Sequence, residues 1–143
     1  MNRTLALIAG ASALLIACTN GERTPAASEA GALTELLTGQ PWQVRSLAGQ
    51  PIAKNSRITL QFRSEHHRVT GNATCNNYSG SFELTGDQLQ IQLSAVTRMA
   101  CADPALSEQE QHFLRLLAGS WRIEFDQAGR LLLRGEDTIV AER

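Results

Sequence analysis

The sequence has 143 residues, a length that suits one domain with a single hydrophobic core. Hydrophobic residues make up 43% and charged residues 19%, as in ordinary globular domains. The formal net charge is −1 and Lys54 is the only lysine, so the clustered basic residues that a nucleic acid requires are missing. We therefore expect no nucleic-acid partner.

The first residues have the three zones of a secretory signal peptide. Arg3 provides a short positive start, an apolar run extends from Leu5 to Ile16, and small residues lead into Cys18. This run is too short to span ~30 Å of hydrocarbon as a helix, which takes about 20 apolar residues. We predict that residues 1–17 are a signal peptide.

The end of the run, Leu15-Ile16-Ala17-Cys18, resembles the lipobox of bacterial lipoproteins. The resemblance implies cleavage before Cys18 and a membrane anchor of acyl chains, such as palmitate, on that residue. The alternative is a plain signal peptide in which Cys18 has no role. By resemblance to Gram-negative sorting rules, Thr19 in place of Asp favours the outer membrane, with the domain in the periplasm.

The segment after the anchor, residues 18–31, is polar with small side chains and has no apolar period. We expect it to form a flexible or partly extended tether with a mean reach of about 20 Å. The folded domain is expected over residues 32–143.

Two cysteines remain once Cys18 is assigned to lipid. Cys75 and Cys101 form an even pair in an oxidising compartment, so a disulfide is expected. Through the entropy of the unfolded chain, this closed loop would stabilise the domain by roughly 3.5 kcal/mol. The alternative is a thiol metal site, but the pair lacks the CxxC spacing of structural zinc sites. We expect no metal and no cofactor.

Hydrophobic periodicity predicts mostly strands. Ala32 to Leu37 has the pattern of a short helix that ends near Gly39. Beyond it, apolar and polar residues alternate in short runs separated by turns such as Gly86-Asp87. The predicted strands lie at residues 42–44, 58–62, 69–71, 78–84, 89–93, 121–125, 131–133 and 139–140.

One longer helix interrupts the strands. Asp103-Pro104 suits an N-cap and a first-turn proline, and Ser107 to Glu110 fits a capping box one turn later. Residues 113–117 carry an apolar helical stripe, and Gly119 ends it. The predicted fold class is therefore mainly β with one main helix (α+β), in a small, partly open antiparallel β-barrel-like sheet.

A short pattern occurs twice. Leu36-Leu37 with Gly39 and Trp42 matches Leu116-Leu117 with Gly119 and Trp121. Each copy has the form of a helix end that leads into a Trp-led strand. The repetition fits an old duplication, or two instances of a common helix-to-strand connection.

Together with Trp42, two segments resemble the META domain of HslJ-like heat-shock lipoproteins. They are Gly71-Asn-Ala-Thr-Cys75-Asn76-Asn-Tyr78-Ser-Gly80-Ser-Phe82 and Thr97-Arg98-Met99-Ala100-Cys101. The resemblance covers about residues 36–140 and implies a small, cracked β-barrel-like fold with a helix, at the bacterial envelope. It also implies an association with heat shock and with tolerance to some drugs, and no established enzymatic activity.

Asn76, Tyr78 and Arg98 lie in these segments and are possible binding residues. The alternative is a structural role, because asparagine side chains bond their own backbone in turns and Arg98 can pair with a carbonyl or carboxylate. A disulfide between Cys75 and Cys101 would bring the two segments side by side.

No catalytic constellation appears in the sequence. Glu65-His66-His67 is the most site-like cluster, but adjacent residues point in different directions and seldom share a metal. His112 lies apart from it, and the nucleophile-elbow and phosphate-loop motifs are missing. Acids such as Glu108 and Glu110 are common on solvated helix faces. We expect no enzymatic activity.

The sequence favours a non-catalytic envelope lipoprotein that contributes to envelope stress or drug tolerance by binding a small apolar ligand or a protein partner. A curled sheet lined by residues such as Ile58 and Phe62 would hold the ligand, if an apolar cleft stays open beside the core. The alternative is an assembly or piloting factor for an outer-membrane or secretion protein. Such a factor would show an exposed apolar patch or a free strand edge.

Overall fold

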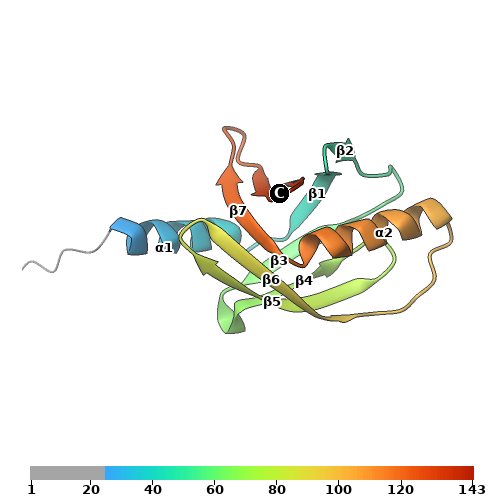
Figure 1. Ribbon diagram of the computed structural model, residues 1–143, viewed down its shortest axis with the longest axis horizontal. Coiled ribbons are helices and arrows are strands. Elements are labelled where there is room, and N and C mark those ends of the chain that lie inside the picture. Colours follow the sequence, from blue (N-terminus) through green and yellow to red (C-terminus); the bar gives the residue numbers. More distant parts are fainter. Residues whose placement is uncertain (1–24) are drawn as a thin grey trace, which may run out of the picture.

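The computed structural model describes residues 25–143, with side chains from Gly31 onward. The predicted signal peptide, Cys18 and the first part of the predicted tether lie outside the described residues. Figure 1 shows the arrangement of the elements. In chain order they are α1 (Pro25–Leu37), β1 (Trp42–Leu47), β2 (Gln50–Pro51), β3 (Thr59–Arg63), the 3-10 turn η1 (Glu65–His67), β4 (Arg68–Asn72), β5 (Asn77–Thr85), β6 (Gln88–Val96), α2 (Pro104–Leu117), β7 (Ser120–Phe125), β8 (Leu131–Arg134) and β9 (Thr138–Glu142).

The strands form one antiparallel sheet whose ends meet. Its order is β2-β1-β3-β4-β5-β6-β7-β8-β9, and β1 also pairs with β9. The strands therefore run in a ring, which matches the predicted small barrel-like sheet. With two helices beside this sheet, the predicted α+β class is confirmed.

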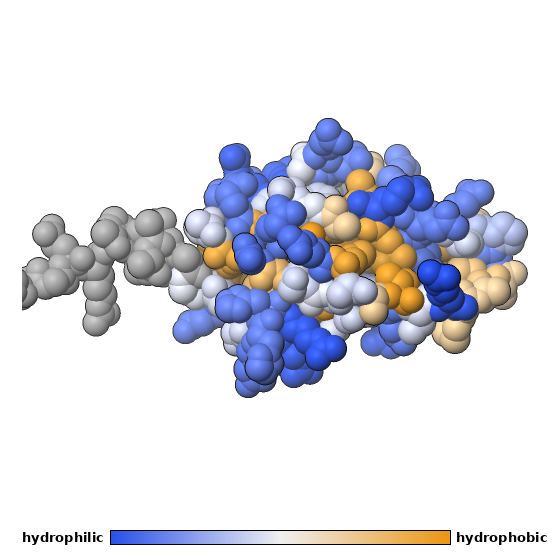
Figure 2. All heavy atoms as spheres, turned by 60° about the horizontal axis from the view of Figure 1, so that its bottom comes forward, coloured by the Kyte–Doolittle hydropathy of each residue, from blue (hydrophilic) through white to orange (hydrophobic). Residues whose placement is uncertain are grey.

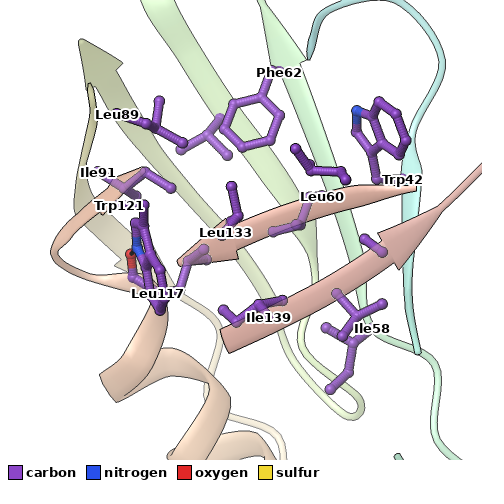
Figure 3. Packing of buried hydrophobic residues seen from close by; sticks show 14 of the residues in the cluster. Trp42, Ile58, Leu60, Phe62, Leu89, Ile91, Leu117, Trp121, Leu133 and Ile139 are labelled. Atoms are coloured by element: carbon purple, nitrogen blue, oxygen red, sulfur yellow. Dashed lines mark hydrogen bonds between the residues drawn. The ribbon is translucent and has the colours of Figure 1, made fainter. Parts of the chain in front are cut away.

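One of the short joins in the ring lies between β6 and β7. These strands pair only through residues 88–90 and 120–122, whereas β5 and β6 pair along almost their whole length. Phe113 and Leu117 of α2 are completely buried, and the Phe113 ring lies 5.7 Å from that of Tyr78 on β5. Figure 3 shows Leu117 and Trp121 on the side of the core where Ile91 lies. Helix α2 thus contributes apolar side chains to the core beside this short β6–β7 pairing.

The core is formed by the residues that alternation predicts to face inward. Burial of such side chains removes apolar surface from water and is the main favourable contribution to folding. Figure 3 shows these side chains pointing toward one another inside the ring. Five of the predicted lining residues are at most 1% exposed, so no apolar cleft opens at them: Ile58, Leu60, Phe62, Leu89 and Ile91.

Helix α1 begins at Pro25, seven residues before the predicted start at Ala32. The last part of the predicted tether, residues 25–31, is therefore helical. Proline suits the first turn, because its missing N–H has no partner there in any helix, and the alanines that follow favour helix. The predicted end is confirmed, with Leu37 as the last residue and Gly39 at φ +101°.

Neither helix in the described part of the chain is long and apolar enough to cross a membrane.

The repeated Leu-Leu-Gly-Trp pattern forms the same kind of hydrogen bond in both copies. The indole N–H of Trp42 donates to the Leu37 carbonyl at 2.9 Å, and that of Trp121 donates to the Leu117 carbonyl at 3.2 Å. Each tryptophan thus satisfies a carbonyl in the last turn of the preceding helix, which has no partner within that helix. In the first copy, Arg143 also forms a cation–π contact, since its guanidinium lies 4.1 Å from the Trp42 ring centroid.

Candidate functional site: a buried junction and a polar groove

Two polar side chains are buried among the described residues, Asn76 at 5% and Glu110 at 6% exposed. Asn76 belongs to the first of the two segments that resemble the META domain, and Glu110 on α2 lies against it. Burying a charge or an amide costs free energy unless its hydrogen bonds are made, so the partners of this pair decide its role.

Glu110 holds the middle of the first segment. Its Oε2 accepts hydrogen bonds from the backbone N–H of Cys75 at 2.8 Å and of Asn76 at 2.7 Å. Its Oε1 accepts from the Asn76 side-chain amide at 2.6 Å. The predictions of a solvated Glu110 and of a capping box with Ser107 are therefore wrong, whereas the predicted N-cap is confirmed by the bond from the Ala105 N–H to the Asp103 carboxylate. The spacing of Glu110 from Phe113 and Leu117 could have indicated its burial, because residues i, i+3 and i+7 share one helix face.

Asn76 holds the second segment. Its Nδ2 donates to the Met99 carbonyl at 3.0 Å and to Glu110, and its Oδ1 accepts from the Met99 N–H at 2.7 Å and from the Thr97 hydroxyl at 2.9 Å. Two donors and two acceptors are the full capacity of a primary amide. Asn76 therefore connects the two segments. Its role is structural, but its side chain bonds distant residues and not the backbone of its own turn, which was the structural alternative expected from the sequence.

The predicted disulfide between Cys75 and Cys101 is present, with its Cα atoms 5.6 Å apart. One sulfur or carboxylate atom from each of Cys75, Cys101 and Glu110 lies within 4.8 Å of the others. The sulfurs are already bonded to each other, and the carboxylate already accepts three hydrogen bonds. This cluster forms a structural junction between the two segments.

Tyr78 also has a structural role. Its ring is buried, and its hydroxyl donates to the Thr59 carbonyl at 2.8 Å. Burial raises the pKa of this phenol well above its ordinary value. Gly71 lies opposite Tyr78 in the β4–β5 register, and a Cβ at Gly71 would come within 2.7 Å of the hydroxyl and 1.9 Å of the Thr59 carbonyl oxygen. Only glycine leaves room for this contact.

The remaining predicted residues are spread over the surface. Arg98 is exposed and forms no hydrogen bond or ion pair with any residue that the structure describes. His66 and His67 are exposed in η1, and His112 is half-buried on α2. Among the described residues these histidines belong to no group of three potential metal ligands, and the structure does not bring them to the junction.

A groove of about 660 Å³ lies on the outer side of the first segment. Residues of β3, β4, β5 and the adjoining loops line it, and the β4–β5 connection also contributes Cys75 and Asn76 to the buried junction. Its lining residues are Arg57, Thr59, Thr70, Gly71, Asn72, Thr74, Asn77 and Tyr78.

Several acceptors in this groove are used within the protein. The Thr59 hydroxyl oxygen accepts from the Asn72 N–H at 3.0 Å. The Asn72 side-chain oxygen accepts from the Thr74 N–H at 3.0 Å, and that of Asn77 accepts from the Asn72 amide at 3.1 Å. In contrast, several donors have no partner among the described residues.

These free donors are the Arg57 guanidinium, the Thr70 hydroxyl and the Asn77 side-chain amide. No carboxylate lines the groove. The groove therefore suits a ligand that offers oxygen acceptors, and it does not suit an apolar one. Sequence reasoning missed Arg57 and Thr70, since isolated polar residues on strands are common.

Apolar surface is limited on the described part of the domain. The large hydrophobic residues that are exposed are Leu36 at 50%, Val96 at 38% and Met99 at 62%. Figure 2 shows one face of the molecule, where hydrophobic side chains form patches between hydrophilic ones. Val96 and Met99 lie in and after the end of β6, next to the disulfide segment.

Comparisons with known proteins agree with the resemblance of the two segments. The family model "META domain" matches residues 35–143. Heat shock protein HslJ of Escherichia coli (strain K12) is 24% identical over 106 residues, which cover 74% of this chain and 75% of HslJ. An NMR structure of a protein from Burkholderia xenovorans has 25% sequence identity and a TM-score of 0.62. That likeness covers 78% of this chain and 86% of the solved one.

Proposed function

The chain belongs to the META domain family, and from that premise we propose that it is a non-catalytic lipoprotein of the bacterial envelope that acts by binding. The similarity to HslJ supports a part in heat-shock or envelope stress. Cys18 would carry the lipid anchor, and its position directly after Leu15-Ile16-Ala17 supports this assignment.

The observation that carries the proposal is the groove beside the first segment. Its free groups are donors, with Arg57 as the charged one and Thr70 as a neutral one. The inner apolar side chains fill the ring, so a bound ligand has to lie on the outer surface. We therefore replace the expected apolar ligand by a polar one that presents oxygen acceptors to the groove.

The experiment is complementation of a strain that lacks the gene, under heat and drug stress. Arg57→Gln removes the positive charge and most of the donors, Thr70→Val removes the hydroxyl at nearly unchanged size, and both should reduce tolerance. Arg122→Gln is the matched control, because Arg122 is also an exposed strand arginine but pairs with Asp87 at 3.3 Å. Immunoblots of membrane fractions check that each variant is present in equal amount.

A catalytic protein would behave differently in the same assay. Single changes of His66, His67, Ser79 or His112 to Ala should leave tolerance nearly intact, because none of them lines the groove. Loss of tolerance in one of these variants, with the protein folded and correctly located, would make an enzyme the better explanation.

A second candidate function is that of an assembly or piloting factor. Val96 and Met99 are exposed, and beyond Ile91 β6 pairs with a strand only on the β5 side. An exposed apolar pair beside a free strand edge can accept a partner's strand. Replacing Met99 by Ser should abolish tolerance under this function, and leave it unchanged if the groove is the binding site.

A further inference from the structure

Two arginines face each other across the outer surface of the sheet. Arg63 on β3 is the direct register partner of Arg68 on β4, and both side chains are exposed. Like charges directly opposite each other destabilise a sheet. Neither arginine forms an ion pair or hydrogen bond among the described residues, whereas other exposed arginines do so: Arg45, Arg122, Arg130 and Arg134.

The arginine pair lies on the same face as the groove. Leu60 and Phe62 point inward on β3, so Thr59, Gln61 and Arg63 alternate with them on the outer side. Thr70 lies between Arg68 and the groove on β4, opposite Gln61. Figure 1 shows β3, β4 and β5 side by side. We call this surface the arginine face: Arg57, Thr59, Gln61, Arg63, Arg68 and Thr70.

The arginine face has positive charge at both ends. Arg63 is six positions after Arg57, which is about 20 Å of extended chain at ~3.3 Å per residue. Hydroxyl and amide groups lie between the two ends. The neighbouring carboxylates are Glu65 in η1 and Glu83 on β5, and neither forms an ion pair within the described part of the chain.

Charge is unevenly divided along the sequence, and this division indicates a positive surface formed by the first half of the domain. Residues 36–82 contain five basic residues, Arg45, Lys54, Arg57, Arg63 and Arg68, against one acid, Glu65. Residues 83–143 contain ten acids and six arginines. The positive face is therefore a local feature of a chain whose net charge is −1.

We propose that the arginine face binds the phosphate groups of anionic lipid headgroups in the membrane that carries the protein. The inference rests on the proposed function, because it assigns a ligand class to the groove and extends the site to Arg63 and Arg68. Arginine presents a planar fork of donors that matches two phosphate oxygens. The threonine hydroxyls and Asn77 add neutral donors at the Arg57 end.

The composition of the face favours headgroups over a protein partner. Stable protein interfaces are built around buried aromatic or large apolar side chains. The exposed large apolar residues of the described domain, Leu36, Val96 and Met99, belong to other segments. Three arginines give only weak membrane attraction, about fivefold in affinity for each. Weak contacts suffice when an anchor already holds the domain near the bilayer.

The test uses the full-length lipidated protein in nanodiscs. One set contains phosphatidylcholine alone, and in the other a third of the lipid is phosphatidylglycerol. NMR follows the side-chain Nε–Hε signals of Arg57, Arg63 and Arg68, with Arg122 as the control on β7. A second arm titrates glycerol phosphate, the soluble headgroup fragment, into protein in the neutral discs.

We expect the signals of the three face arginines to shift in the phosphatidylglycerol discs, and that of Arg122 to stay. The shifts should shrink at ~1 M salt, where the Debye length is about 3 Å. Arg63→Gln should lower the affinity for glycerol phosphate about fivefold, the contribution expected of one exposed arginine. Arg122→Gln should leave that affinity unchanged.

Two other results would overturn the inference in distinguishable ways. Shifts with glycerol phosphate but none in the phosphatidylglycerol discs would assign the face to a soluble phosphate ligand. No shift in either arm would remove the phosphate assignment, while the complementation assay with Thr70→Val would still decide whether the groove binds a neutral polar ligand.

Discussion

At the scale of single residues, the two motif segments depend on one amide and one carboxylate. Asn76 uses all four of its hydrogen-bonding positions, and Glu110 fixes two consecutive backbone N–H groups. Such bonds in a buried setting are stronger than in water, and an unpaired member is correspondingly costly. Their role is to fix the chain that forms the groove wall, and neither residue faces the groove.

Replacing Glu110 by Ala should destabilise the domain by about 3 kcal/mol, because it leaves buried donors of Cys75 and Asn76 without an acceptor. Urea unfolding followed by tryptophan fluorescence measures the loss. Glu108→Ala is the matched control on the same helix, where Glu108 is exposed, and it should change stability by no more than about 0.5 kcal/mol. Equal effects of the two substitutions would contradict the assigned junction.

Tyr78 is the only tyrosine in the chain, so tyrosinate absorbance reports on it alone. Burial raises its pKa above the unfolded value of about 10. The buried neutral phenol therefore contributes its full stability to the fold below pH ~10. This contribution to the free energy of unfolding is lost as the pH rises above that value. We expect no tyrosinate in the folded protein near pH 10, and normal titration in urea. A reversible midpoint near 10 in folded protein would show that the phenol is not buried.

At the scale of elements, close approach of β3, β4 and β5 is possible only at a glycine. Gly71→Ala would place Cβ 1.9 Å from the Thr59 carbonyl oxygen, so the strands must move apart. We expect a loss of about 1–3 kcal/mol in thermal or urea unfolding. The matched substitution Gly31→Ala meets no atom within 4 Å in α1 and should stabilise by about 0.5–1 kcal/mol. Similar changes for both would argue against the β3–β5 contact.

The disulfide links the loop before β5 to the loop before α2 across 26 residues. Peptide mapping without reductant should find Cys75 and Cys101 in one linked species. Reduction should lower stability by about 2–5 kcal/mol, the usual loss in a small exported domain. Free thiols at both positions in freshly exported protein would contradict the pairing.

The elements predicted from sequence share one property, which is that neighbouring residues determine them. Alternation at residues 58–62 and the Asp103-Pro104 cap needed no distant contact to be recognised. The start of α1 was missed because small polar residues resemble a tether. Glu110 was missed because its partners lie 34 and 35 residues away, beyond what periodicity reports. The arginine pair likewise depends on the β3–β4 register.

At the scale of the whole molecule, a filled ring leaves function to the surface. The inner side chains are buried, and the outer face of β3–β5 gathers unpaired arginines beside a groove of donors. In the proposed arrangement, acyl chains on Cys18 hold the domain near the membrane and the face makes the specific contact. Anchor and face would then act together, so loss of either should reduce stress tolerance.

The most direct test of binding at the groove is site-specific photocrosslinking in living cells. A photoreactive residue at position 72, within the groove, is compared with one at position 132 on β8, which lies outside it. The account predicts an adduct at position 72 that disappears when Arg57 is changed to Gln, and none at position 132. Adducts at position 132 alone, or an adduct at position 72 that persists without Arg57, would contradict binding through the groove.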